Sequence, residues 1–110
     1  MQDRFYDTNA NYVDWQDNLQ HYAEGIELIL TRNDINAEFV NATLSRKNSK
    51  YPIGIISFEI TGDWKHEHAY ADELVTDKYG TRRVFKIEEI DEEDTGDDWY
   101  TSTHVYYVLL

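Results

Sequence analysis

The chain of 110 residues has no cysteine, only one proline and no long hydrophobic run. The lack of cysteine excludes disulfides, thiolate chemistry and cysteine-based zinc sites, and it fits a reducing cytosol. The apolar runs are a few residues long, far short of the roughly 20 residues that cross a bilayer. Because the N-terminus also lacks the apolar stretch of a signal peptide, we expect a cytoplasmic protein that does not contact membranes.

Positive charge is scarce as well. The sequence has 10 Lys and Arg against 22 Asp and Glu, which gives a formal net charge of −12. Nucleic acids and anionic membrane surfaces repel a chain of this charge. We therefore expect no direct nucleic-acid binding and a basic protein as partner.

Aromatic side chains are abundant, at 15% of the residues. Disordered chains are poor in aromatics, so this chain is expected to fold despite its charge. Its length suits one domain, residues 1–110, with a core of its own. The chain is too short for a multidomain enzyme, a solenoid or a large cofactor-binding fold.

The hydrophobic pattern predicts one long helix followed mainly by strands. Residues 1–11 lack apolar periodicity and are expected to form an arm. Spacings of three and four then predict an amphipathic helix over 12–30, with a stripe made of Tyr12, Trp15, Leu19, Tyr22, Ile26, Ile29 and Leu30. Alternating or β-prone segments predict strands at 38–44, 53–60, 81–90 and 100–110. The predicted fold is α+β, with the helix packed on an antiparallel sheet of about four strands.

Three finer expectations follow from the same pattern. In the third strand, Phe85 and Ile87 should point inward. The apolar end of the fourth strand, Val108 to Leu110, should be paired rather than frayed. The stretch 64–79 is ambiguous. We predict a strand leading into a loop over 64–71, with His66 and His68 on one face, and a short helix or turn over 72–79.

The clearest local feature is the acidic run at 88–98, where eight of eleven residues are carboxylates and no Lys or Arg follows. One interpretation is a solvated connection that aids solubility. The other is a docking surface for a basic partner, since the Lys and Arg of a nucleic-acid groove also accept carboxylates. Trp and Tyr beside the run are candidate anchors. The predicted partner-binding residues are Glu88, Glu89, Asp91, Glu92, Glu93, Asp94, Asp97, Asp98, Trp99 and Tyr100.

Metal binding and catalysis have weaker signals. His66 and His68 could share an ion with Asp63 or with His104, but two histidines at this spacing are few for zinc. We therefore expect surface histidines, no metal and no cofactor. No phosphate-binding loop, nucleophile elbow or metalloprotease motif occurs in the sequence, and an exposed acidic run does not raise a carboxyl pKa. We expect no enzyme activity.

In size, charge and helix-plus-sheet build, the chain resembles the compact acidic inhibitors that phages and mobile elements direct against host defences. These are the anti-CRISPR proteins, the anti-restriction proteins and the uracil-DNA glycosylase inhibitors. The resemblance is one of general character, and no residue roles are transferred from it. It implies steric or DNA-mimic blockade of a nuclease in a bacterial host. The alternatives are an immunity protein for a basic nuclease toxin, a structural component of a virion or homo-oligomer, and a small metal-dependent enzyme. A homodimer stays open.

Overall fold

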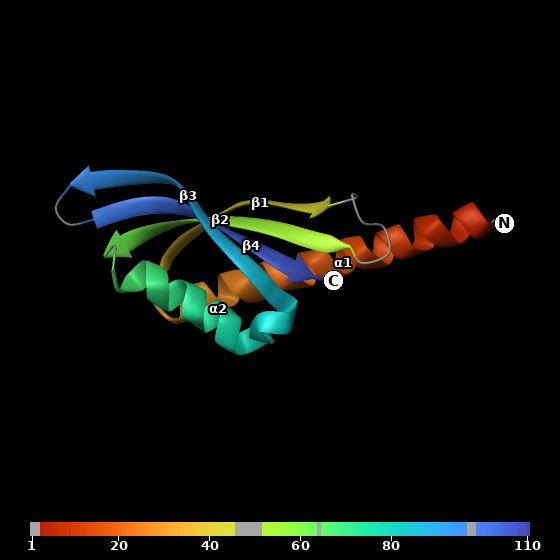
Figure 1. Ribbon diagram of the computed structural model, residues 1–110, viewed down its shortest axis with the longest axis horizontal. Coiled ribbons are helices and arrows are strands. Elements are labelled where there is room, and N and C mark those ends of the chain that lie inside the picture. The colour runs from red at the N-terminus through yellow and green to blue at the C-terminus, as the bar shows by residue number, and fades with distance from the viewer. Residues whose placement is uncertain (1–2, 46–51, 64, 97–98) are drawn as a thin grey trace.

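The structure, a computed structural model, describes residues 3–45, 52–63, 65–96 and 99–110, with side chains from residue 15 onward except at 91, 92 and 95. It is an α+β fold in which the N-terminal helix packs on an antiparallel sheet, as predicted. Figure 1 shows the arrangement. The elements are α1 (Asp3–Arg32), β1 (Asn36–Ser45), β2 (Ile53–Asp63), α2 (Glu67–Arg83), β3 (Val84–Gly96) and β4 (Trp99–Leu109).

The elements form two units with the same order, α1-β1-β2 and α2-β3-β4, called here the first and the second unit. The described strands lie in the order β1-β2-β4-β3, so β2 and β4 pair at the centre and β1 and β3 form the edges. Both helices cover the same face of the sheet (Figure 1). The opposite face, called here the open face, has no helix over it in the described part of the chain.

The core lies between the helices and the sheet. Leu19, Ile26 and Leu30 of α1 are buried, as the predicted stripe requires, and they belong to one cluster with Ile56 and Phe58 of β2. Burial of such side chains is worth about 1.5–3 kcal/mol each, so this stripe fixes α1 on the sheet.

Glycines allow two close approaches at this layer. A Cβ at Gly25 of α1 would overlap the Tyr79 hydroxyl of α2, and a Cβ at Gly54 of β2 would lie 2.7 Å from Leu19 Cδ1. Gly25 weakens helix propensity, but here it lets the two helices meet, with the rings of Tyr22 and Tyr79 5.1 Å apart.

Two predicted boundaries were wrong. The arm expected over 1–11 is helical from Asp3, because α1 extends past the sheet and needs no apolar stripe there (Figure 1). The strand expected over 64–71 is the start of α2, which begins at Glu67. His68, Ala71 and Val75 are its buried residues. Their spacing is helical, but the histidine weakens the apolar pattern that would reveal it.

The third predicted strand begins later than expected, since 81–83 still belong to α2. Its register shifts between Val84 and Lys86, so Phe85 is the extra residue of a bulge. Phe85 is consequently 46% exposed, not inward, whereas Ile87 packs against the core as expected. The end of β4 is paired as predicted, with Leu109 opposite Ile53 and the Leu110 amide donating to the Pro52 carbonyl at 3.2 Å.

Candidate functional site

The acidic run lies mainly on β3, an edge strand of the described sheet. Successive side chains of a strand point to opposite faces, so the run is divided between both faces. Glu88 and Ile90 stand opposite Val105 and Thr103 on the open face, whereas Glu89 stands opposite His104 on the helix-covered face. The structure therefore brings the described carboxylates of the run to one edge but not onto one flat surface.

Glu88 is held by partners within the protein. The Tyr107 hydroxyl donates to Glu88 Oε1 at 2.6 Å, and Lys86 Nζ lies 3.3 Å from Oε2. The tyrosine hydrogen bond, followed by the lysine, lowers the pKa of the Glu88 carboxyl, and the same bond raises the pKa of Tyr107. Glu88 is therefore ionised and partly neutralised, which makes it a weaker contact residue than the sequence suggested.

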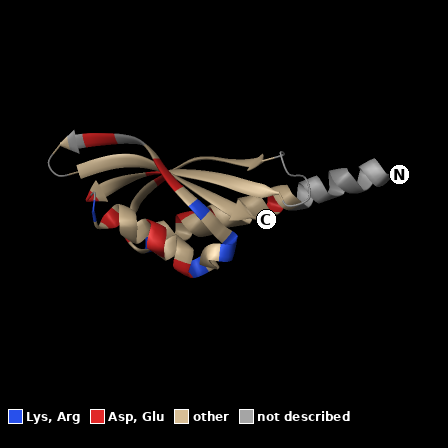
Figure 2. Ribbon diagram, viewed as in Figure 1, with Lys and Arg blue, Asp and Glu red and all other residues tan. Residues whose placement is uncertain are grey.

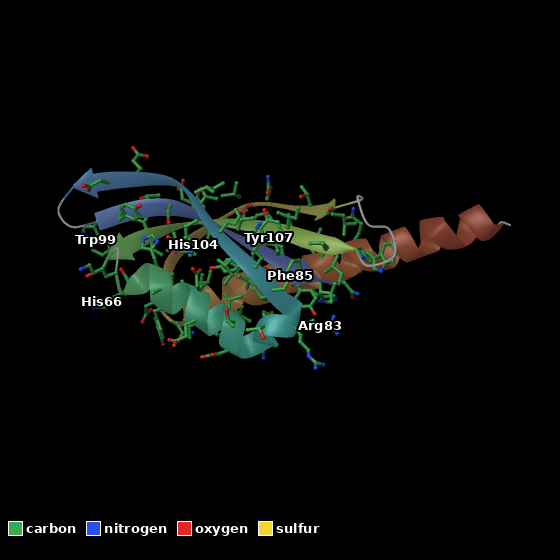
Figure 3. The ribbon with its side chains drawn as sticks, viewed as in Figure 1. His66, Arg83, Phe85, Trp99, His104 and Tyr107 are labelled. Atoms are coloured by element: carbon green, nitrogen blue, oxygen red, sulfur yellow. The ribbon has the colours of Figure 1, made fainter. Side chains whose placement is uncertain are left out.

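Carboxylates and an exposed indole meet at the far end of the sheet, called here the acidic corner. Trp99, 48% exposed, stands opposite Asp63 of β2 on one side and Gly96 of β3 on the other. Glu93 and Asp94 are exposed just before Gly96. The corner lies at the opposite end of the molecule from the N-terminus (Figures 1 and 3).

Local hydrogen bonds organise the acidic corner. The amides of Lys65 and His66 donate to Asp63 Oδ1 and hold the pKa of Asp63 below its usual value. Asp94 Oδ1 accepts from the amide of Gly96, whose φ of 84° lies in the left-handed region that glycine favours. These bonds hold the carboxylates of Asp63 and Asp94 in place near the ends of β2 and β3.

Four of the described cations lie at the other end of β3, whereas Lys65 follows Asp63 beside the acidic corner. Lys78, Arg82 and Arg83 occupy the second half of α2, and Lys86 follows near the start of β3. Figure 2 shows these blue segments apart from the red segment at the end of β3. Lys86 and Asp94 are eight residues apart on the strand, which corresponds to about 26 Å at 3.3 Å per residue.

The remaining predicted contact residues differ in what the structure says of them. Tyr100 is half-buried, and its ring lies edge-on to His68 at 5.4 Å between centroids. It is therefore more a core residue than an anchor. The side chains of Asp91 and Glu92, and all of Asp97 and Asp98, lie outside the described residues.

A second group of polar side chains, called here the histidine cluster, is buried between α2 and β4. His68 of α2 and His104 of β4 are 1% and 0% exposed, and the centroids of their rings are 5.1 Å apart, with the ring planes inclined by 28°. His68 Nδ1 lies 2.9 Å from His104 Nε2. The expectation that His68 is a surface residue was wrong, whereas His66 is exposed and lies beside Asp63.

The partners of the histidine cluster come from the same two elements. Asp72 Oδ1 lies 2.7 Å from His104 Nδ1 and accepts from the Tyr106 hydroxyl at 3.0 Å. Ser102 Oγ lies 3.0 Å from His68 Nδ1. Burial first, and then the charge of Asp72, raises the pKa of Tyr106 well above its usual value, so the phenol stays protonated.

Asp72, Ser102 and Tyr106 were not predicted as site residues. A signal for them exists in the sequence, because Ser102, His104 and Tyr106 alternate along one face of a strand. Asp72 lies one helical turn after His68, so both reach the same side of α2. The pairing of His68 with His104 was one of the arrangements foreseen from the sequence.

The comparisons and the hydropathy of the helices add two findings. Neither protein-family models, nor curated protein sequences, nor solved structures give a significant match to this chain. Among the described residues, neither helix combines the length and apolar character needed to span a membrane.

Proposed function

We propose that this protein is a small acidic inhibitor that binds and blocks a nucleic-acid-binding protein in the cytoplasm of a bacterial host, such as a CRISPR effector or a restriction nuclease. It acts as a binding protein, without catalysis. One observation carries the proposal. Glu93 and Asp94, on an edge strand of the described sheet, lie beside an exposed Trp99 at the acidic corner.

The acidic corner has the composition of a binding patch. Exposed carboxylates attract a cationic surface and accelerate association, while an exposed indole supplies apolar contact area. Trp99 is nearly half exposed although its ring would gain by burial. A partner that covers the ring while pairing with Glu93 and Asp94 would use both features.

The separation of charge along β3 predicts how the protein is oriented when it approaches its partner. The cations near Lys86 lie about 26 Å from the acidic corner along the strand, farther than the screening length of about 8 Å at physiological salt. Those four cations therefore oppose a cationic partner at the acidic corner only weakly, and Lys65 alone among the described Lys and Arg follows directly on the corner. We expect the far end of the β3–β4 hairpin to enter the partner's groove first.

The spacing on the strand supports nucleic-acid mimicry. Carboxylates two residues apart on one face are separated by about 6.6 Å. Each strand of duplex DNA carries one charge per about 3.4 Å of axis, so carboxylates on both faces of an edge strand approach that density. An Arg or Lys groove built for phosphates can pair with them.

Charged edge strands also have a plainer role, since they prevent edge-to-edge pairing between copies of a chain. If this is all that the acidic residues do, the protein has no salt-sensitive cationic partner. An assembly protein would instead form stable homo-oligomers, and an immunity protein would bind a toxin nuclease rather than a defence nuclease.

The test is capture of partners from bacterial lysate on the immobilised full chain. We expect bound proteins identified by mass spectrometry to be nucleic-acid-binding, to be displaced by duplex DNA, and to elute when salt shortens the screening length from about 10 Å at 0.1 M to about 3 Å at 1 M. Purified target should then lose its nuclease activity on addition of this protein.

Two variants with equal loss of charge make the test specific. The corner variant Glu93→Gln/Asp94→Asn/Asp97→Asn/Asp98→Asn should bind about tenfold or more weakly. The control variant Asp17→Asn/Glu24→Gln/Glu27→Gln/Glu38→Gln removes the same number of carboxylates from α1 and β1. Equal binding by both variants, or a captured protein that DNA does not displace, would refute the proposed docking surface.

A further inference from the structure

We propose that His68, His104 and Glu89 form a binding site for a divalent transition-metal ion, most suitably Zn²⁺. Their ligand atoms all lie within 4.8 Å of one another. They come from three different elements, α2, β4 and β3, which the fold brings together. The site does not depend on the proposed inhibitor function, because its two histidines lie between α2 and β4 and its carboxylate, Glu89 of β3, is not a residue of the acidic corner.

The hydrogen bonds of the two histidines fix where their lone pairs point. A carbonyl oxygen can only accept, so His68 Nε2, 3.0 Å from the Tyr100 carbonyl, carries its proton there. His104 Nδ1 likewise donates to the Asp72 carboxylate at 2.7 Å. In neutral imidazoles the other nitrogens, His68 Nδ1 and His104 Nε2, then both present lone pairs.

These two lone pairs converge on the same point. The nitrogens are 2.9 Å apart, and both rings are buried. The Ser102 hydroxyl, 3.0 Å from His68 Nδ1, can donate to one of them, but the two facing lone pairs still repel each other unless a shared proton or a metal ion lies between them. Zn²⁺ bound at about 2.0–2.1 Å from each nitrogen in tetrahedral geometry separates them by about 3.4 Å. A small rotation of either ring provides this distance.

The surroundings are those of a metal site. Histidines that bind metal usually donate their other ring N–H to a carboxylate or a backbone carbonyl, which holds the ring in place. Both histidines here do so, one to Asp72 and one to Tyr100. The charges also balance, because the carboxylates of Glu89 and Asp72 together offset a divalent ion.

Glu89 completes the site and provides access. It stands opposite His104 in the β3–β4 register and is exposed, so an ion can enter from the edge of the sheet. Two imidazoles and one carboxylate suit zinc, and three protein ligands leave a fourth position for water. His66, although only two residues from His68, lies beside Asp63 and takes no part.

The test is titration of the full chain, purified without a His-tag and stripped with chelator, with Zn²⁺ by calorimetry and with Co²⁺ by absorption. We expect one ion per chain and a Co²⁺ spectrum of low coordination number. Glu89→Gln should weaken binding at least about tenfold, and Asp72→Asn about 10- to 100-fold. Circular dichroism should show that both variants remain folded.

Two matched controls separate this site from adventitious binding. Glu88→Gln removes a neighbouring carboxylate that points to the open face, and His66→Gln removes the exposed histidine. Both should bind zinc as the unmodified chain does. Absence of saturable binding, or equal affinity in Glu89→Gln and Glu88→Gln, would refute the metal site while leaving the inhibitor proposal intact.

Discussion

The first and second units have the same order of elements but fill the core differently. On the helix-covered face, the buried side chains described for α1-β1-β2 are apolar, for example Ile26 and Phe58. In α2-β3-β4, the buried apolar residues are joined by His68, Ser102 and His104. The polar part of the core therefore belongs to the second unit.

The comparison shows that different interactions stabilise the two units. Apolar burial is non-directional and tolerates exchanges that conserve volume. A buried polar group instead requires each partner in place, because an unpaired one costs about 1–3 kcal/mol. The bonds from His68 and Asp72 to β4 consequently specify how α2 lies on the sheet.

The largest effect is expected in the apolar core of the first unit. Phe58→Ala should lower the free energy of unfolding by about 3–5 kcal/mol, because it leaves a cavity beneath the rings of Phe39 and Tyr106. Denaturant unfolding measures this value. A loss below about 1 kcal/mol would mean that the first unit is not closely packed and would remove the contrast.

A smaller effect is expected from one polar residue of the second unit. His104→Leu should cost about 1–3 kcal/mol, because His68 Nδ1 and Asp72 Oδ1 each lose a partner. The double variant His68→Leu/His104→Leu should cost clearly less than the sum of the two single variants. Additivity within about 0.5 kcal/mol would show that the two histidines do not act as one network.

The smallest effect is expected from removing one hydroxyl. Tyr106→Phe should cost about 0.5–1.5 kcal/mol at neutral pH, since Asp72 keeps the bond from His104.

The cost of the same variant should become smaller in alkali. The folded-state pKa of Tyr106 lies well above the value of 10.0 in the unfolded chain, so its contribution to stability is present below about pH 10 and is lost as pH rises further. In metal-free buffer, the phenylalanine variant should lose less stability than the unmodified chain between about pH 9 and about pH 11. Parallel losses would show that burial does not hold this proton.

The apolar elements were predictable because their signal is local. The stripe of Leu19, Ile26 and Leu30 repeats at helical spacing, and Ile56, Phe58 and Ile60 alternate along β2. Each pattern directly reflects which side faces away from water. The fold class follows from these patterns alone.

The second helix was not predictable in the same way. Its buried face begins with His68, whose burial is stable only because its ring has hydrogen-bond partners in Tyr100, Ser102 and His104. These partners lie more than thirty residues further along the chain. No short stretch of sequence around the second helix contains those partners. The register shift at Phe85 was missed for a similar reason, since strand pairing rather than alternation decides which side chain a bulge exposes.

The acidic corner and the histidine cluster also differ in how far the sequence predicts them. The sequence placed the acidic residues next to Trp99 but ended the predicted strand at residue 90, whereas β3 continues to Gly96, and the faces of Glu88 and Glu89 depend on their pairing with β4. The histidine cluster depends wholly on contacts between α2 and β4.

By itself, the sequence determined the negative charge, the long amphipathic first helix and the strand-rich remainder, because composition and periodicity act at short range. Only the tertiary structure decided that β2 and β4 pair at the centre, that β3 becomes an acidic edge, and that His68 meets His104. These depend on contacts between distant residues, whose formation is set by how the two units pack rather than by any local preference.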